Sequence, residues 1–134
     1  MTVERLAAVA ARYAALRWLG MGLFMASAAT FLLALTAAAL GRAEWLHALP
    51  GIFAMGMSLG AFGTANDTAV HAMAELARRG ALPERHRGEL ATEQSRRPGR
   101  LESVHASPRA ALVFPVLAAV VMVWVLTRSL QSMA

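Results

Sequence analysis

The sequence contains no cysteine and no lysine. The absence of cysteine excludes disulfide bonds, thiolate metal sites and cysteine nucleophiles. All 13 basic residues are therefore arginine, and charged residues occupy only 16% of the 134 positions. Hydrophobic residues occupy 57%, and the mean hydropathy is +0.49. Because soluble domains are about 45–50% apolar and about one quarter charged, this composition disfavours disorder and an ordinary water-soluble enzyme.

Long stretches without a charged residue occur three times, at Trp18–Leu40, Leu46–Asn66 and Ala110–Thr127. A membrane helix needs about 20 apolar residues, whereas a barrel strand would alternate over about 10. A soluble bundle is the alternative, but its helices would have to be apolar all round. The sequence therefore predicts an all-α integral membrane protein with three transmembrane helices. The predicted spans are residues 18–40, 46–76 and 110–130.

Arginine placement predicts the orientation of these spans. Eleven of the 13 arginines precede the first span or lie between the second and the third, two regions that share one side of a three-span protein. Only Arg42 and Arg128 fall on the other side. The positive-inside rule then predicts a cytoplasmic N-terminus and an outside C-terminus. Since the chain is rich in alanine and arginine, we expect it in a bacterial inner membrane.

The segment 1–17 has the apolar periodicity of an amphipathic helix. Leu6, Val9, Tyr13 and Leu16 recur at steps of three and four residues. Two arrangements fit this pattern. The segment either lies among the anionic headgroups of the cytoplasmic leaflet, attracted by its arginines, or simply extends the first span.

The connection 77–109 is predicted to be a basic cytoplasmic loop in contact with anionic headgroups. Pro83 and Glu84 favour the start of a short helix, which Gly88 weakens. The loop from 80 to 107 mixes both charge signs and has no aromatic residue or recognised binding motif, so nucleic-acid binding is not expected.

The second span has a small and polar side. Residues four apart lie on one helix face, so two neighbouring ridges are predicted. One ridge comprises Gly63, Asp67, His71 and Glu75, and the other comprises Gly56, Gly60, Thr64 and Thr68. We expect helix packing between Gly56, Gly60, Gly63 and Thr64 of this span and a small ridge that includes Ala26 and Thr30 of the first. The third span has no polar group in its middle and is expected to face lipid, and Pro115 is expected to kink it near its cytoplasmic end.

Depth decides how costly Asp67 is. If Arg78 and Arg79 mark the membrane surface, Asp67 lies about 16 Å further in, near mid-depth of an upright helix. It lies shallower if Arg78 stands clear of the lipid. A charge deep in a span costs about 2.5–3.5 kcal/mol on insertion scales, so Asp67 needs a partner, a proton or water. His71, one turn away, is the expected partner.

Several functions fit this polar cluster of Asn66, Asp67, Thr68, His71 and Glu75. The favoured one is structural: the cluster makes interhelical contacts in a non-catalytic subunit or oligomerising component, whose partners are other membrane subunits or copies of itself. A proton or cation pathway through Asp67, His71 and Glu75 is the alternative. Axial ligation of haem or chlorophyll by His71 is another, and the identity of any cofactor stays open. A pore-forming lysis protein also remains open.

Two further kinds of chemistry have little support. A metal site is disfavoured because one helix supplies too few ligands. No nucleophile–base arrangement, phosphate loop or catalytic carboxylate pair is evident, so enzymatic activity of this chain alone is not expected.

Overall fold

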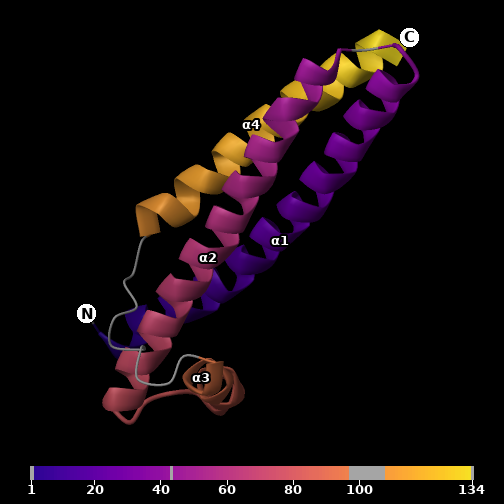
Figure 1. Ribbon diagram of the computed structural model, residues 1–134. Helices are drawn as coiled ribbons and strands as arrows, with labels where there is room; N and C mark the ends of the chain where they lie inside the picture. Colours follow the sequence, from indigo (N-terminus) through magenta and orange to yellow (C-terminus); the bar gives the residue numbers. More distant parts are fainter. Residues whose placement is uncertain (1, 43, 97–107, 134) are drawn as a thin grey trace.

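The computed structural model describes residues 2–42, 44–96 and 108–133, and every regular element in these ranges is helical. The elements are α1 (Val3–Ala39), the 3₁₀ turn η1 (Trp45–Ala48), α2 (Leu49–Arg78), α3 (Glu84–Arg96) and α4 (Pro108–Met133). Figure 1 shows α1, α2 and α4 as three long rods packed together, with the short α3 near the N-terminal end. This confirms the predicted all-helical class, with three helices that are each long and apolar enough to cross a membrane.

Helix α1 runs without a break through the predicted boundary between residues 17 and 18. Its first half buries Leu6, Ala10 and Tyr13 against α2 and α3. The predicted apolar face therefore contacts protein, and the segment extends the first span, the second of the two expected arrangements. At its start, the Thr2 side chain caps the helix by accepting a hydrogen bond from the Arg5 amide.

Glycine ends both α1 and α2. Gly41 and Gly80 follow these helices with φ values of 71° and 68°. Glycine adopts this left-handed conformation without steric penalty. After α2 the amide of Gly80 donates to Ala77 and the amide of Ala81 donates to Leu76, the two bonds of a Schellman motif. The motif stops each helix and turns the chain back along the bundle.

The closest approach of α1 and α2 is made by small residues. A Cβ atom added to Gly20 would lie 2.7 Å from the backbone nitrogen of Phe62. Further along the same interface, the hydroxyl oxygens of Ser27 and Ser58 are 3.4 Å apart in a buried pair. Neither residue pair belongs to the predicted ridges. The packing residue on α1 is Ser27, whereas the predicted Ala26 is exposed.

Helix α4 packs on α2 and α1 through a narrow stripe. The buried residues of this stripe are Ala111, Ala118, Val125 and Ser129. Most of its large residues, such as Val116 and Val120, are exposed at 62%. The expectation that this span faces lipid is therefore wrong for the buried stripe, and most of the rest of its described surface is exposed. The helix continues through the buried Pro115, where a kink was predicted.

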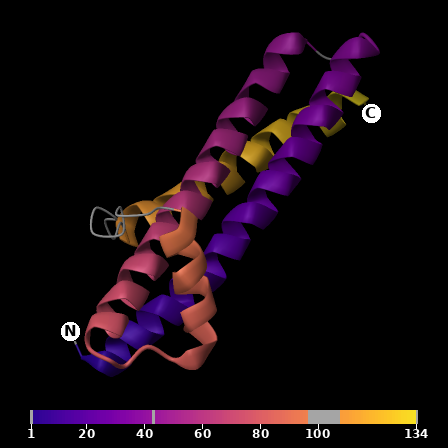
Figure 2. The same cartoon turned by 60° about the horizontal axis from the view of Figure 1, so that its bottom comes forward.

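Helix α3 confirms the short helix predicted to open at Glu84. In Figure 1 it is seen nearly end-on while α1 and α2 run across the page, so it crosses the pair. Figure 2 brings it forward and shows it against the N-terminal half of the bundle. Its buried face is formed by His86, Leu90 and Glu93, and Leu90 joins the core between α1 and α2.

The uncharged parts of the long helices begin at the same level of the bundle. Nη1 of Arg17 donates to Oδ1 of Asn66 at 3.1 Å, so these residues share one level of the bundle. Beyond Arg17, α1 and its turn have no charged residue before Arg42. Beyond Asp67 in the opposite direction, α2 and η1 have none before Glu44. The uncharged parts of α1 and α2 therefore begin together.

The uncharged part of α4 begins at this level too. A Cβ on Gly60 would lie 3.0 Å from the Phe114 ring, which fixes the register of the antiparallel pair. Asn66 follows Gly60 by six residues, and Pro108 precedes Phe114 by six residues. Because the two helices are antiparallel, Asn66 and Pro108 lie at about the same level of the bundle. The last charge before the uncharged part of α4 is Arg109. We call the shared level of Arg17, Asn66 and Pro108 the polar boundary.

A two-helix stem continues past the polar boundary. It consists of residues 3–16 of α1 and 67–78 of α2, and α3 lies across it. The α2 part alone is about 18 Å long at 1.5 Å per residue. Because α3 exposes charged side chains on its outer face, the stem region suits water or headgroups rather than hydrocarbon.

Candidate polar site at the boundary

The predicted polar cluster of α2 divides between two sides of the helix. Asn66 faces Arg17 and α3, whereas Thr68, His71 and Glu75 line a pocket against α1 and the start of α4. Asp67 is partly exposed between them. The five residues of the predicted cluster therefore do not share one side of the helix. Successive helical residues point about 100° apart, so Asn66 points away from the ridge of His71 and Glu75.

The position of Asp67 along the bundle bears on the predicted mid-membrane depth of this residue. Asp67 follows Asn66 and so lies at the polar boundary, with His71 and Glu75 further down the stem. Arg78, at the end of α2, stands clear of the uncharged region. A bilayer placed over the uncharged stretches would therefore leave Asp67 at its edge and not at its centre.

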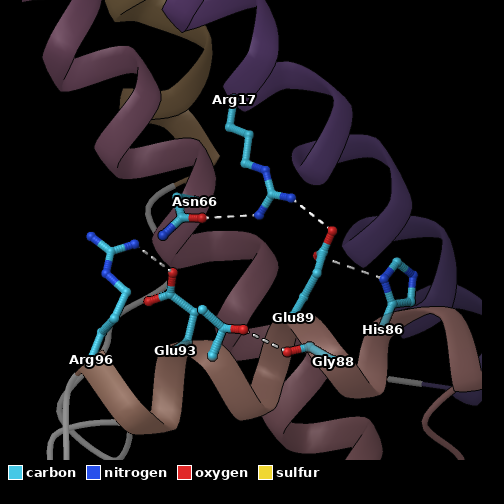
Figure 3. Close-up of polar contacts among 8 residues, drawn as sticks. Arg17, Asn66, His86, Gly88, Glu89, Glu93 and Arg96 are labelled. Atoms are coloured by element: carbon cyan, nitrogen blue, oxygen red, sulfur yellow. Dashed lines mark hydrogen bonds and ion pairs between the residues drawn. The ribbon is translucent and has the colours of Figure 1, made fainter.

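Arg17 organises the side of the stem that holds α3. Its Nη1 contacts Asn66, and its Nη2 donates to Oε1 of Glu89 at 2.8 Å (Figure 3). The Arg17 side chain is only 12% exposed, against 39% for Glu89. A guanidinium that bridges two helices in this way ties α3 to both α1 and α2, and charge-assisted bonds of this kind are stronger than neutral ones.

Further ionisable groups lie along the buried face of α3. His86 is 7% exposed, and its Nδ1 lies 3.9 Å from Oε2 of Glu89, within ion-pair range but too far for a hydrogen bond. Glu93 is 6% exposed and accepts a hydrogen bond from Arg96 at 3.3 Å. Figure 3 shows these side chains rising from α3 toward α1 and α2. No periodic pattern in the sequence predicted these residues, because α3 is polar on nearly every face.

A pocket of about 470 Å³ opens between α3 and the uncharged part of the bundle. Trp18, Phe62 and Val70 supply apolar lining. The polar lining comprises Arg17, Asn66, Glu89, Thr92, Glu93 and Arg96, with Gly88 beside them. This volume lies within the range of small-molecule sites, about 300–1,000 Å³. The pocket therefore has apolar and ionic walls and lies at the polar boundary.

A second pocket of about 400 Å³ lies on the opposite side of α2. Its lining comprises Leu6, Val9, Tyr13, Thr68, His71, Ala72, Glu75, Arg79 and Pro108. Glu75 forms ion pairs with both Arg78 and Arg79 at 3.2 Å. His71 is the residue of this lining for which axial ligation of a cofactor was predicted. Among the described residues, no group of three or more His, Asp or Glu side chains could hold a metal ion.

Threonine hydroxyls on the predicted ridges bond within their own helices. Thr64 donates to the carbonyl of Gly60 and Thr68 to that of Thr64, both at 2.7 Å. Thr30 on α1 donates to the carbonyl of Ala26 at 2.8 Å. A hydroxyl has one proton to donate, and these threonines donate it to carbonyls of their own helices.

The predicted glycine ridge separates in a similar way. Gly60 contacts Phe114 of α4, not α1. In the described part of the chain, nothing lies within 4 Å of a Cβ built on Gly56 or Gly63. The close contacts expected at these two positions within the chain are therefore missing, and their surface of α2 is open to the outside of the bundle.

Comparison of the chain with protein-family models, with curated proteins and with solved structures found no match.

Proposed function

We propose that this chain is a non-catalytic membrane protein that packs against another helix through the open edge of α2. The observation that carries the proposal is the pair Gly56 and Gly63. Nothing in the described structure lies within 4 Å of a Cβ built on either residue, whereas a Cβ on Gly60 would meet Phe114. They are seven residues apart and so lie on one side of the helix. Small residues in membrane helices let a second backbone approach closely. The partner is a second copy or another membrane subunit.

The neighbouring helices explain why this edge is available. Small residues fill the α1 interface at Gly20, and Phe114 of α4 covers Gly60 on the other flank. Large exposed side chains, Ile52 and Leu59, flank the two open glycines at 52% and 51% exposure. The edge thus places two glycines beside large exposed apolar side chains, a surface against which another helix in lipid can pack.

Replacing Gly56 with leucine should weaken assembly about tenfold, an effect of about 1.4 kcal/mol. The leucine would occupy the space into which the partner backbone packs, while the bundle itself has room for it. Sedimentation in detergent, together with identification of co-purifying chains, measures this. Val120→Leu is the control, since Val120 is already 62% exposed on α4. Wild-type assembly of the Gly56 variant would contradict the proposal.

The proposed setting is a bacterial inner membrane, with the stem and α3 in the cytoplasm. Eleven arginines on that side support this orientation through the positive-inside rule. Exposed tryptophans support the depth of the bundle. Trp18 begins the uncharged stretch at the polar boundary and is 65% exposed, while Trp45, at the start of η1 near the other end, is 59% exposed. Indole rings favour the two membrane–water interfaces.

Cysteine labelling tests the orientation. We expect Ser95→Cys on α3 and Glu44→Cys before η1 to react with an impermeant thiol reagent from opposite sides, with only the second labelled in intact spheroplasts. Both positions are exposed, and Glu44 avoids the strained left-handed backbone at Gly41. Labelling of Ser95→Cys alone would reverse the orientation, and equal labelling of both would contradict the three-span arrangement.

A proton or cation pathway within one chain has weaker support. Asp67, His71 and Glu75 lie at or beyond the polar boundary, as described above. The uncharged part of α2 between Leu49 and Asn66 offers no ionisable group, nor does α4 between Ala110 and Thr127. An ion entering at Asp67 would therefore find no titratable relay on these helices toward the other side.

A further inference from the structure

We infer that the pocket between α3 and the polar boundary binds the headgroup of a zwitterionic phospholipid that carries a primary ammonium, as in phosphatidylethanolamine. The inference rests on the proposed membrane setting, but not on the proposed assembly edge, which lies elsewhere on α2. We name this pocket of about 470 Å³ the α3 pocket.

The α3 pocket is positioned for a lipid rather than for a soluble ligand. Trp18 and Phe62 line it from the uncharged part of the bundle, and Thr92 and Arg96 line it from α3. A molecule that fills it would contact apolar side chains at one end and ionic groups at the other. A phospholipid at the polar boundary has that division between its acyl chains and its headgroup.

The charges of the described residues that line the α3 pocket are balanced. Arg17 and Arg96 contribute two cations, while Glu89 and Glu93 contribute two anions. One member of each sign remains available to a ligand, since the side chain of Arg96 is 66% exposed and Oε2 of Glu89 is buried without a hydrogen-bond partner among the described residues. The guanidinium of Arg96 can donate to a phosphate, and the carboxylate of Glu89 can accept from an ammonium.

This balance selects among headgroups. An anionic headgroup would gain the arginine contact but would meet the carboxylates of Glu89 and Glu93 without a cation to offer them. A choline headgroup has a positive charge but no N–H to donate. An ethanolamine headgroup supplies both a phosphate acceptor and an ammonium donor, so it alone of the three satisfies both walls of the pocket.

Native mass spectrometry of the full chain tests the inference. The protein is purified in detergent and incubated with equimolar dioleoyl phosphatidylethanolamine, phosphatidylcholine and phosphatidylglycerol. We expect one phosphatidylethanolamine per chain, retained about tenfold more than either competitor. Equal retention of the three lipids, or preferential retention of phosphatidylglycerol, would overturn the inference.

Two variants and a matched control locate the site. Arg96→Gln should lower retention of phosphatidylethanolamine about tenfold, because it removes the accessible guanidinium. Arg85→Gln on the same helix is exposed and does not line the pocket, so it should match the wild type. Glu89→Gln keeps an oxygen for Arg17 but should abolish the preference over phosphatidylcholine. Equal retention by the Arg96 and Arg85 variants would contradict the assignment.

Free phosphoethanolamine distinguishes a lipid from a soluble ligand with the same polar groups. We expect the bound lipid to stay in place when this compound is added at a hundredfold molar excess, because it lacks the acyl chains that would contact Trp18 and Phe62. Displacement would show that the apolar wall contributes nothing and would overturn the lipid assignment. The Gly56→Leu variant should retain the lipid as the wild type does, so failure of the assembly proposal would leave this result unchanged.

Discussion

Replacing Gly20 with alanine should destabilise the bundle by about 1–3 kcal/mol, the range found for overpacked cores. The added methyl group would lie 2.7 Å from the Phe62 nitrogen and 3.2 Å from the Ala61 carbonyl carbon. Both are backbone atoms, so no side-chain rotation can relieve the clash, and α1 and α2 must move apart. Unfolding in mixed micelles of increasing denaturing-detergent fraction, followed by helical circular dichroism, measures the loss.

Gly22 provides the matched control two residues along the same helix. In the described structure nothing lies within 4 Å of a Cβ built there. Gly22→Ala should therefore leave stability unchanged or raise it by up to about 1 kcal/mol, because alanine favours helix over glycine. Equal destabilisation by the two substitutions would contradict Gly20 as the point of closest contact.

Replacing Arg17 with glutamine should release α3 from the stem while leaving the long helices folded. The substitution removes a guanidinium that is 12% exposed, together with its bonds to Asn66 and Glu89. Losing hydrogen bonds to a charged group costs about 1.5–3 kcal/mol, and the partial exposure of Glu89 lowers this toward about 1–2 kcal/mol. Amide hydrogen exchange in 84–96 should then accelerate about five- to thirtyfold.

Arg12→Gln is the control for this prediction, since Arg12 is exposed on the same helix. Its exchange in 84–96 should match that of the wild type. Slow exchange in the Arg17 variant would show that the apolar contact of Leu90 with the stem core holds α3 by itself.

The spans, the helical class and the short helix at Glu84 follow from local patterns. A long uncharged stretch in lipid must pair its own backbone N–H and C=O groups, and a helix does this within the segment. Proline and an acidic residue at a helix start act within one turn of chain. Neither signal depends on which helix neighbours which, so the sequence alone determined them, although it left open whether residues 1–17 form a separate helix.

Packing partners were decided only by the tertiary structure. A GxxxG spacing states that a backbone can approach, but not which one, and here Gly60 meets Phe114 while Gly20, outside any such motif, makes the tight contact. The partners of Arg17 were hidden in the same way. Asn66 and Glu89 lie 49 and 72 residues from it in the chain and meet it only because α1 and α2 are antiparallel and α3 crosses them. Depth depended on the same register, because the polar boundary appears only when the contacts set three helices side by side. Local periodicity thus determined the elements, and long-range contacts decided where Asp67 lies and which groups share a pocket.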